Sequence, residues 1–401
     1  MSTSALSLAT RLDGVSESAT LKLNAAVNAM KSQGVEVFNL AAGEPDFNVD
    51  DRVKEAVVEA LKQNKSKYTP AAGNVDLRTA IAEKTNKQQP SVSTHTPWKA
   101  ADVVVTNGGK QALFNAFLAT LDPGDEVIIP SPYWLSYPEM VKIAGGVPKI
   151  VQTTLESGFR ITPEQLRNAI TPKTRMLIVN SPSNPTGAMY SKSELAALGE
   201  VLSWPSSSRV LVLSDEIYDR IILGDTPFTS FLEAAPQLRE RVITVNCLSK
   251  SAAMTGWRVG WSVAPTWVTA GMATLQGQST SGINSLAQAA SVAALKLPRE
   301  YFDANEKTFR RRCDLVLEIL SKSSKLDVFR PGGAFYVFVG VGRSLKPGED
   351  SMGFAERLLE GAKVAVVPGT PFGGKEFLRL SFATDENTIR KGCERLVEFA
   401  N

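Results

Sequence analysis

Five apolar runs rich in β-branched residues recur along the chain, and polar residues, glycines or prolines follow each of them directly. This pattern constrains the fold strongly, because a strand that is apolar at nearly every position must be buried on both faces. Helix-like stretches separate several runs, such as KQALFNAFLATL at 110–121 and SKSELAALGEVL at 191–202. Strands that alternate with helices predict an α/β fold with a mostly parallel sheet between layers of helices. The runs are ADVVVTNGGK (101–110), DEVIIPSPYW (125–134), RMLIVNSPSNPTG (175–187), RVLVLSDEIYDR (209–220) and RVITVNCLSK (241–250).

The ends of these five predicted strands carry the candidate functional residues. In open α/β sheets, ligands bind beyond the carboxyl ends of the strands. We therefore expect these residues to converge on one edge of the sheet. Each of them alone fits a plain turn, but packing does not explain the combination. They are Gly108, Gly109 and Lys110; Tyr133 and Trp134; Asn184; Asp215 and Tyr218; and Lys250.

The two ends of the chain are less regular and predict a second, smaller α/β domain. Residues 16–48 contain a helix-like stretch and then VFNLAAGEPDF, and charged helical segments begin near residue 293. We expect a large domain over 49–292 and a small domain built from 1–48 and 293–401. One long helix near 290–321 is expected to connect them.

Composition narrows the possible partners and compartment. The chain has 401 residues and a net charge of only +3, with Lys and Arg spread along it, so no nucleic-acid partner is expected. The tight cluster RRR at 310–312 is interpreted as a solvated helix face. No apolar run approaches the roughly 20 residues of a membrane helix, and MSTSALSLATRL lacks the apolar core of a secretory signal. Three scattered cysteines, Cys247, Cys313 and Cys393, favour a reducing compartment, so we expect a cytoplasmic protein without a metal site.

The chain contains a single histidine, His95, in the loop-like stretch PSVSTHTPW. Histidine is the usual general base near neutral pH. A Ser-His-Asp or Cys-His mechanism would have to use this one residue, and no Gly-x-Ser-x-Gly motif accompanies it. We interpret His95 as a solvent-exposed loop residue, so an enzyme of this sequence must move protons with another group.

Lys250 is the strongest candidate for that group. A lysine at a buried strand end is costly unless it is paired or neutralised, and a salt-bridged surface lysine is the simple alternative. Burial beside a cation makes an amine nucleophilic toward carbonyls. The motif NGGK at 107–110 leads into a helix whose first N–H groups would bind an anion such as a phosphate. The guanidinium of Arg258 would bind the same phosphate through paired hydrogen bonds. An ordinary strand-to-helix turn and an interior ion pair are the simpler readings of these two features.

A second group of residues suits an aromatic ring. Asp215, at the end of its strand, would keep a pyridine nitrogen protonated. Tyr218 and Asn184 would reach an oxygen on such a ring, and Trp134 or Tyr133 would lie against its face. A solvated strand end and core aromatic residues are the alternatives. Taken together, these residues match the needs of pyridoxal 5'-phosphate.

The chain resembles the fold-type I pyridoxal-phosphate enzymes, in particular the class I aminotransferases and their prokaryotic-type aspartate aminotransferase branch. The matching motifs run in family order from about residue 11 to the end. They are LAAGEPDF, KYTPAAG, NGGKQALF, SPYWLSYPEM, NSPSNPTGA, SDEIY, SKSAAMTGWRVGW, GGAFYV, VVPGT and LRLSFAT. The resemblance implies a seven-stranded, mostly parallel sheet in the large domain.

The resemblance also implies a role for each matching residue. Lys250 corresponds to the Schiff-base lysine and the base of the proton shift, while Arg379 corresponds to the arginine that binds the substrate α-carboxylate. Arg379 alternates with leucines, as a strand-borne ligand should. Cofactor contacts are implied for Gly108, Gly109, Lys110, Trp134, Asn184, Asp215, Tyr218, Ser249, Arg258 and, from the neighbouring subunit of a homodimer, Tyr68. Substrate contacts are implied for Gly43, Lys110, Trp134, Asn184 and Arg379.

Two positions depart from the family pattern. Many relatives have a phosphate-binding serine three residues before the lysine, where this chain has Cys247. Ser249 or the backbone is expected to compensate. The better-studied aspartate enzymes have a histidine three residues after the stacking tryptophan, where this chain has Tyr137. The sequence therefore does not determine which residues contact Asp215.

The substrate is less constrained than the reaction. A cation in the first turn of a helix opposes the helix dipole by roughly 0.3–1 kcal/mol, so Lys110 is expected to bind an anion. The resemblance assigns it the distal carboxylate, which predicts aspartate and glutamate with oxaloacetate and 2-oxoglutarate as substrates. The alternatives are prephenate, for which Arg11 and Ser18-Ala19-Thr20 are candidate determinants, aromatic or broad-specificity transamination, a lyase or cyclopropane-forming synthase, and a non-enzymatic binding protein.

Overall fold

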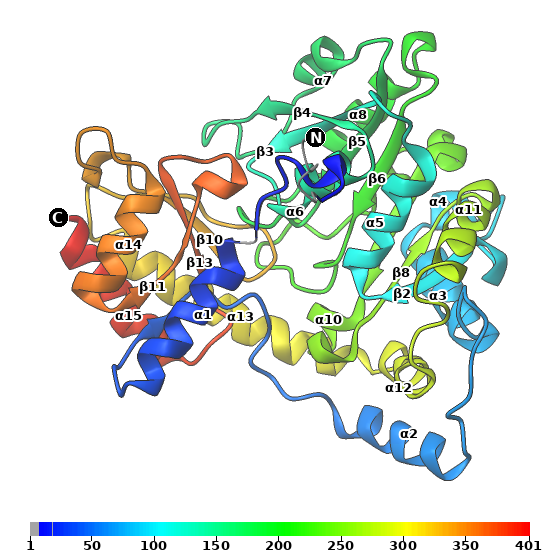
Figure 1. Cartoon of the computed structure of the whole chain (residues 1–401), viewed down its shortest axis with the longest axis horizontal. Coiled ribbons are helices and arrows are strands. Elements are labelled where there is room, and N and C mark those ends of the chain that lie inside the picture. The colour runs from blue at the N-terminus through cyan, green and yellow to red at the C-terminus, as the bar shows by residue number, and fades with distance from the viewer. Residues whose placement is uncertain (1–7, 18) are drawn as a thin grey trace, which may run out of the picture.

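Seven strands form the central sheet of the computed structural model, which describes residues 8–17 and 19–401 (Figure 1). Only β8 runs antiparallel to its neighbours, while the other neighbouring pairs are parallel. The predicted mostly parallel, seven-stranded sheet of an α/β fold is confirmed. The order across the sheet is β2 (Val103–Asn107), β8 (Val259–Val263), β7 (Val242–Cys247), β6 (Leu211–Asp215), β5 (Thr174–Asn180), β3 (Glu126–Ser131) and β4 (Val147–Gln152).

Successive residues of the central strands pack into different cores on opposite faces of the sheet. Val103 and Val105 belong to one core, and Val104 belongs to the other. Side chains alternate along a strand, so strands that are apolar throughout supply both cores at once. One core also contains residues of α3 (Val75–Gln88), α7 (Pro163–Ala169), α8 (Lys192–Leu202) and α12 (Ser285–Leu295), and the other those of α5 (Gly109–Thr120), α6 (Ser136–Ile143) and α11 (Thr266–Gly277).

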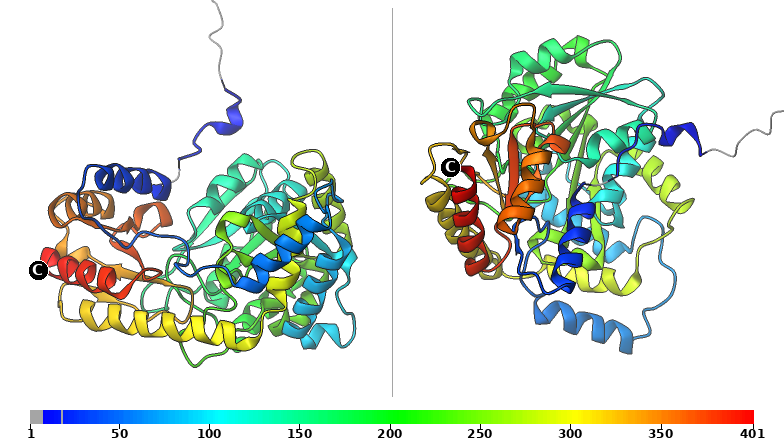
Figure 2. Two further views of the ribbon diagram at one scale, coloured as in Figure 1. Left: turned by 90° about the horizontal axis from the view of Figure 1, so that it is seen from below. Right: turned by 60° about the vertical axis from the view of Figure 1, so that its left-hand side comes forward.

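Both ends of the chain build a second α/β unit around a separate core (Figures 1 and 2). β1 (Phe38–Asn39) pairs with β11 (Val364–Ala365), which ties the N-terminal part to the C-terminal part. The predicted boundaries at 48 and 292 stay a prediction, and the second one falls inside α12. The other elements of this unit are the sheet β12 (Val367–Pro368), β13 (Phe377–Ser381), β10 (Tyr336–Gly340) and β9 (Asp327–Val328), with helices α1 (Ala19–Ser32), α14 (Ser351–Ala362) and α15 (Glu386–Ala400).

One long helix, α13 (Arg299–Leu320), connects the two units, as the sequence predicted, but it begins at Arg299 rather than near residue 290. α12 ends at Leu295 and α13 begins after Pro298. Proline lacks the amide hydrogen that a helix needs and disfavours helical geometry in the residue before it, so α13 does not continue back into α12. α13 then runs along the molecule from one unit to the other (Figure 2).

The remaining elements are short, apart from α2 (Asp51–Lys62), which packs against α12. None of the helices in the described part of the chain is both long and apolar enough to cross a membrane. The short helices are α4 (Pro90–Ser93), α9 (Phe231–Ala234), α10 (Leu248–Ser251), and the 3-10 helices η1 (Thr10–Leu12), η2 (Ala100–Asp102), η3 (Pro205–Ser207), η4 (Pro236–Arg241), η5 (Thr255–Trp257), η6 (Gly342–Ser344) and η7 (Thr370–Phe372).

The triple arginine of α13 does not form one solvated face, as the sequence predicted. Arg312 is buried and bonds to Asp46, whereas the neighbouring Arg311 is exposed and pairs with Glu386. Arg310 donates to the carbonyl oxygens of Ile222 and Gly224. Consecutive residues of a helix point about 100° apart, so three in a row cannot share one environment.

Gly260 of β8 allows the sheet to approach the first turn of α5. A β carbon at this position would lie 2.2 Å from the backbone nitrogen of Gly109 and 2.4 Å from the carbonyl carbon of Gly108. Gly256, in the same motif, has open space where its β carbon would be. Close packing therefore requires a glycine at 260 and not at 256.

We expect Gly260→Ala to lower the free energy of unfolding by about 1–3 kcal/mol, because an added methyl group forces the backbone of α5 away from the sheet. Gly256→Ala is the matched control and is expected to change it by less than about 0.5 kcal/mol. Urea unfolding of the two variants and the parent protein measures both values. Equal effects of the two substitutions would contradict this account of Gly260.

Candidate active site

Two adjoining cavities, of about 520 and 240 Å³, lie at the carboxyl ends of the parallel strands. The strand ends do converge there, as the sequence predicted. Lys110, Trp134, Asp215 and Lys250 line both cavities. Of the other predicted residues, Gly109, Ser249 and Arg258 line only the larger cavity, Asn184, Tyr218 and Arg379 line only the smaller one, and Gly43 lines both.

Lys250 places its amine where the two cavities meet. The strand that precedes it ends at Cys247, and Lys250 lies in the single turn of α10 rather than at the strand end itself. The turn directs the half-buried side chain across the site, where Nζ donates to the carbonyl oxygen of Gly43. Nζ also lies 5.7 Å from the centre of the Phe335 ring. The amine therefore has a backbone acceptor and no carboxylate within ion-pair distance among the described residues.

Asp215 is a buried carboxyl group at the end of β6, with 1% of its surface exposed. Tyr137 donates its hydroxyl hydrogen to Oδ2 at 2.6 Å, and the amide of Ile217 donates to Oδ1 at 3.3 Å. Burial raises the pKa of Asp215 to about 6, while these two hydrogen bonds lower it. The sequence analysis left the residues around Asp215 undetermined, and the structure shows that Tyr137 contacts its carboxyl group directly.

Gly108, Gly109 and Arg258 form a corner suited to an anion. Gly108 precedes α5 with φ of +79°, and a β carbon there would lie 2.5 Å from Nη2 of Arg258. The amide of Gln111 donates to the carbonyl oxygen of Gly108 at 3.1 Å. The amides that precede it at a helix N-terminus have no partner within the helix and favour negative charge. Lys110 adds a second positive group, and its pKa is lowered by burial and then by the charge of Arg258. This corner holds cations and amide donors close together, an arrangement that an anion would stabilise.

Cys247 and Ser249 lie beside this corner on the larger cavity. Cys247 is 3% exposed, and burial raises the pKa of its thiol, so it stays neutral and is a weak hydrogen-bond donor. Ser249 supplies a hydroxyl group on the same cavity. The sequence analysis expected this residue to replace the phosphate-binding serine of the relatives.

Arg379 and Asn184 meet at the other end of the site. Nη1 of Arg379 donates to Oδ1 of Asn184 at 3.0 Å, and Nη2 donates to the carbonyl oxygen of Ala41 at 3.2 Å. Arg379 is 3% exposed, and among the described residues its Nε has no partner and no carboxylate pairs with it. A buried guanidinium that lacks a counter-ion is arranged to receive an anion from a ligand.

Tyr336 is the main residue that the sequence analysis missed. Its hydroxyl group bonds to that of Tyr218 at 3.1 Å, and its ring lies 4.4 Å from Cζ of Arg379. Tyr336 therefore contacts two predicted residues, Tyr218 and Arg379. Tyr218 and Tyr336 are 118 positions apart in the sequence. The motif GGAFYV marked the segment, but only the pairing of β10 with β13 brings Tyr336 next to Arg379.

Some predicted residues lie outside the two cavities. Tyr133 lines neither of them, and Trp134 is the aromatic residue of this pair that faces the site. Tyr68 is fully exposed in this single chain, so its predicted reach into a neighbouring subunit stays a prediction. Arg11 belongs to η1 and also lines neither cavity, whereas Thr20 lines both. Ser18 lies outside the described residues.

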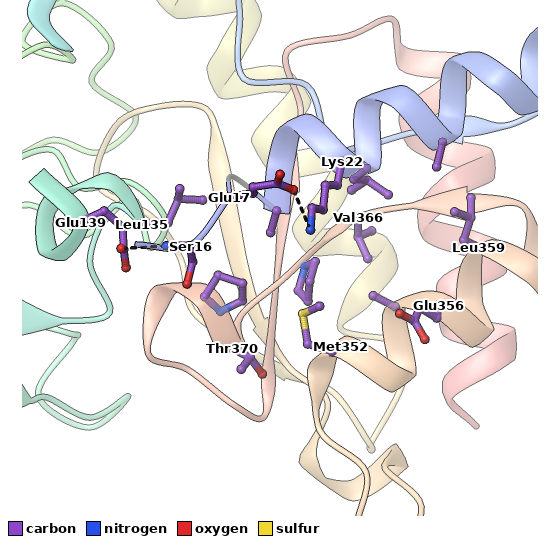
Figure 3. A pocket seen from close by; sticks show the side chains of 16 residues that line it. Ser16, Glu17, Lys22, Leu135, Glu139, Met352, Glu356, Leu359, Val366 and Thr370 are labelled. Carbon is purple, nitrogen blue, oxygen red and sulfur yellow. Dashed lines mark hydrogen bonds and ion pairs between the residues drawn. The ribbon is translucent and has the colours of Figure 1, made fainter. Parts of the chain in front are cut away.

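A separate, mostly apolar cavity of about 580 Å³ lies between α1, α6 and α14 (Figure 3). Glu17 and Lys22 form an ion pair of 2.9 Å at its edge, and the amide of Ser16 donates to Glu139. Of the candidate residues named from the sequence, this cavity contains only Ala19, a candidate determinant for prephenate. Within the part of the chain described here, no group of three or more His, Cys, Asp or Glu side chains is placed to hold a metal ion.

The sheet order, together with a lysine and a buried carboxyl group on one cavity at its strand ends, defines a fold-type I transferase. A family model described as aminotransferase class I and II matches residues 35–396, and the chain belongs to this family. The family that the sequence resembled is thereby confirmed.

Individual relatives are similar over nearly their whole length. A probable aspartate/prephenate aminotransferase of Rhizobium leguminosarum bv. phaseoli is 42% identical over 399 residues, which are 98% of each chain. An aspartate/prephenate aminotransferase of Cereibacter sphaeroides is equally similar. Among solved structures, the aspartate aminotransferase from Thermus thermophilus with maleate has a TM-score of 0.91 and 44% identity, covering 98% of this chain and 100% of that one. The Rhizobium meliloti aspartate aminotransferase has a TM-score of 0.92 and 40% identity, covering 99% of both.

The raised pKa of Asp215 predicts a pH-dependent loss of stability in the cofactor-free protein. The folded state keeps the proton up to about pH 6, while the unfolded state releases it near pH 3.8. Stability therefore falls as the pH rises through this window, by up to about 3 kcal/mol. Asp215→Asn removes this loss, so the variant should become more stable than the parent protein as the pH rises from about 4 to 6, with no further change above. Urea unfolding at several pH values measures the difference, and a constant difference would contradict the prediction.

Proposed function

We propose that this chain binds pyridoxal 5'-phosphate in the larger cavity. The residues fit that group: the Gly108–Gly109 turn and Arg258 form a phosphate corner that a β carbon at 108 would fill. Asp215 is buried where a ring cation would compensate its charge, and Lys250 offers the amine that would hold the aldehyde. Trp134 lies beside these groups, with its ring centre 4.9 Å from Nζ of Lys110. When bound, this group supplies an electron sink that makes the α-hydrogen of an amino acid acidic.

We propose that the reaction is transamination of aspartate with 2-oxoglutarate, which yields oxaloacetate and glutamate. Lys250 lines both cavities together with Asp215, and in this proposal its free amine takes the α-proton. Tyr218 and Asn184 orient the reacting end, and Tyr336 holds Tyr218 in place through its hydroxyl group. His95 is exposed in a turn and lines neither cavity, so the proposed mechanism uses no histidine.

The observation that carries this proposal is the buried Arg379 with no carboxylate partner among the described residues. A free amino acid supplies one carboxylate, which suits the planar fork of this guanidinium. The amine of Lys110, which lines the same smaller cavity as Arg379, offers a second positive group for a distal carboxylate. Two cations on one cavity favour dicarboxylic substrates, and the names of the relatives agree with this.

Prephenate is a second candidate acceptor, since the Rhizobium leguminosarum and Cereibacter sphaeroides relatives are named aspartate/prephenate aminotransferases. Like aspartate, prephenate carries two carboxylates.

We further propose a homodimer in which Tyr68, fully exposed here, completes the phosphate corner of a second copy. The three cysteines are buried and unpaired, which agrees with a reducing compartment such as the cytoplasm.

The covalent role of Lys250 is tested by borohydride reduction of the protein incubated with pyridoxal phosphate. We expect the mass tag on the peptide that contains Lys250, and its loss in Lys250→Ala together with a fall in turnover of about 10³-fold or more, because no other group is placed to move the α-proton. Lys110→Ala is the control and should keep the tag. A tag retained by Lys250→Ala on another lysine would refute the assignment.

The role of Lys110 is tested by substrate preference. Lys110→Ala should lower kcat/KM for aspartate about 10–100-fold, since a hydrogen bond to a charged group is lost. The value for an apolar amino acid such as leucine should change by less than about threefold, and Lys110→Arg should keep most of the preference for aspartate. Equal losses for both amino acids would show that Lys110 acts on the cofactor or the fold instead.

A further inference from the structure

The segment between β1 and α2, residues 40–50, has no regular secondary structure, and its residues Ala42, Gly43 and Glu44 line the larger cavity. Because no helix or sheet ladder holds it, its path depends on individual contacts. Three of these come from residues of the site or next to it. Arg379 donates to the carbonyl oxygen of Ala41 at 3.2 Å, Lys250 donates to that of Gly43, and Thr255 donates to Glu44 at 2.6 Å.

The contact between Lys250 and Gly43 matters most for chemistry. The carbonyl oxygen of Gly43 is the hydrogen-bond acceptor for Nζ, so it sets where the free amine lies. A backbone oxygen in an irregular segment is a precise acceptor only if the residues around it are immobilised. The next fixed point along the chain therefore decides how firmly Gly43 is held.

Beyond the hydrogen bond from Thr255 to the side chain of Glu44, the next fixed point is an ion pair between Asp46 and Arg312 of α13. Nη1 and Nη2 of Arg312 donate to the two carboxylate oxygens of Asp46 at 2.7 and 2.8 Å, which is bidentate geometry. The Arg312 side chain is 10% exposed and that of Asp46 is 31% exposed. The guanidinium also lies 5.6 Å from the centre of the Phe47 ring, which packs against Phe309 of the same helix.

The hydrogen bonds of Arg312 do not fully compensate the cost of burying its charge, so stabilising the fold does not explain its position. Its Nε is buried without a hydrogen-bond partner among the described residues, and Asp46 is its only carboxylate partner there. A buried guanidinium loses its hydration, and a single pair often fails to recover that loss. Bidentate pairing does fix the distance and angle between two segments. α13 connects the two units of the fold and is anchored in a core through Phe309, Cys313 and Val316, so it is a rigid support.

We propose that Arg312 is a positioning residue: through Asp46 it holds the carbonyl oxygen of Gly43 against the amine of Lys250. This rests on the proposed function, in which Lys250 moves the α-proton. Weakening the Asp46–Arg312 pair would leave the cofactor bound. The amine of Lys250 would then no longer be held at a fixed position relative to the substrate carbon. Proton transfer slows, while substrate binding at Arg379 is preserved.

The test compares Asp46→Asn with Arg311→Ala. Arg311 is the neighbouring residue of α13, and its ion pair with Glu386 is exposed and remote from the site, so it is a matched control. In Asp46→Asn we expect kcat to fall about tenfold, because small misplacements of reacting groups are costly, with KM little changed. The isotope effect on kcat with α-deuterated aspartate should rise, since proton transfer becomes more rate-limiting. Arg311→Ala should match the parent protein in both.

A second measurement needs no turnover. In the cofactor-free protein, acylation of Lys250, followed by peptide mass spectrometry, should be about threefold faster or more in Asp46→Asn, because its amine loses a fixed hydrogen-bond acceptor. If Asp46→Asn does not fold, as judged by thermal unfolding, Arg312→Lys keeps the charge and loses the bidentate geometry, and the same changes are expected.

The outcomes separate this proposal from the proposed function. A folded Asp46→Asn with the kcat, isotope effect and acylation rate of the parent protein overturns the positioning role. So does a lower kcat with an unchanged isotope effect and acylation rate, which would mean a purely structural pair. A parent protein that transaminates no amino acid overturns the proposed function, while the acylation rates still decide whether the pair positions Lys250.

Discussion

The active site depends on burying ionisable groups from both sheets beside one cavity: Asp215 ends β6 of the seven-stranded sheet, and Arg379 lies on β13 of the four-stranded sheet. Asp215 and Arg379 are almost completely enclosed, and neither has an opposite charge within ion-pair distance in the described part of the chain. Such groups are costly to bury, and the two cores on either face of the seven-stranded sheet offset that cost. The same burial raises the pKa of Asp215 and leaves Arg379 ready for a carboxylate. Stability and chemistry therefore compete at one place in the molecule.

Some parts of the site that bind and orient are backbone atoms in irregular segments. The amides before α5 and the carbonyl oxygens of Ala41 and Gly43 lie where regular structure stops. Such atoms have no fixed position of their own, so neighbouring side chains must supply it. Arg258 packs against Gly108, Tyr336 supports Arg379, and Arg312 reaches the segment of Gly43 through Asp46. A second layer of contacts thus surrounds the residues that touch the ligand.

The sequence predicted the strands and the convergence of their ends well, because apolar β-branched runs are a local signal that burial enforces. It predicted Lys250 and Asp215 as site residues for the same reason. It failed where the outcome depended on a single local break or on a distant neighbour. The connecting helix begins only after Pro298, and Arg312 is buried rather than solvated because Asp46, far away in sequence, lies next to it.

The sequence by itself determined the fold class and the family and named the candidates for the reactive groups, since strand pattern and motif spacing are read along the chain. Only the tertiary structure decided which groups touch. Tyr137 as the donor to Asp215, Tyr336 as the support of Tyr218 and Gly43 as the acceptor for Lys250 all join residues far apart in sequence. Hydrogen bonds act over about 3 Å, and no pattern along a chain specifies separations that small between remote segments.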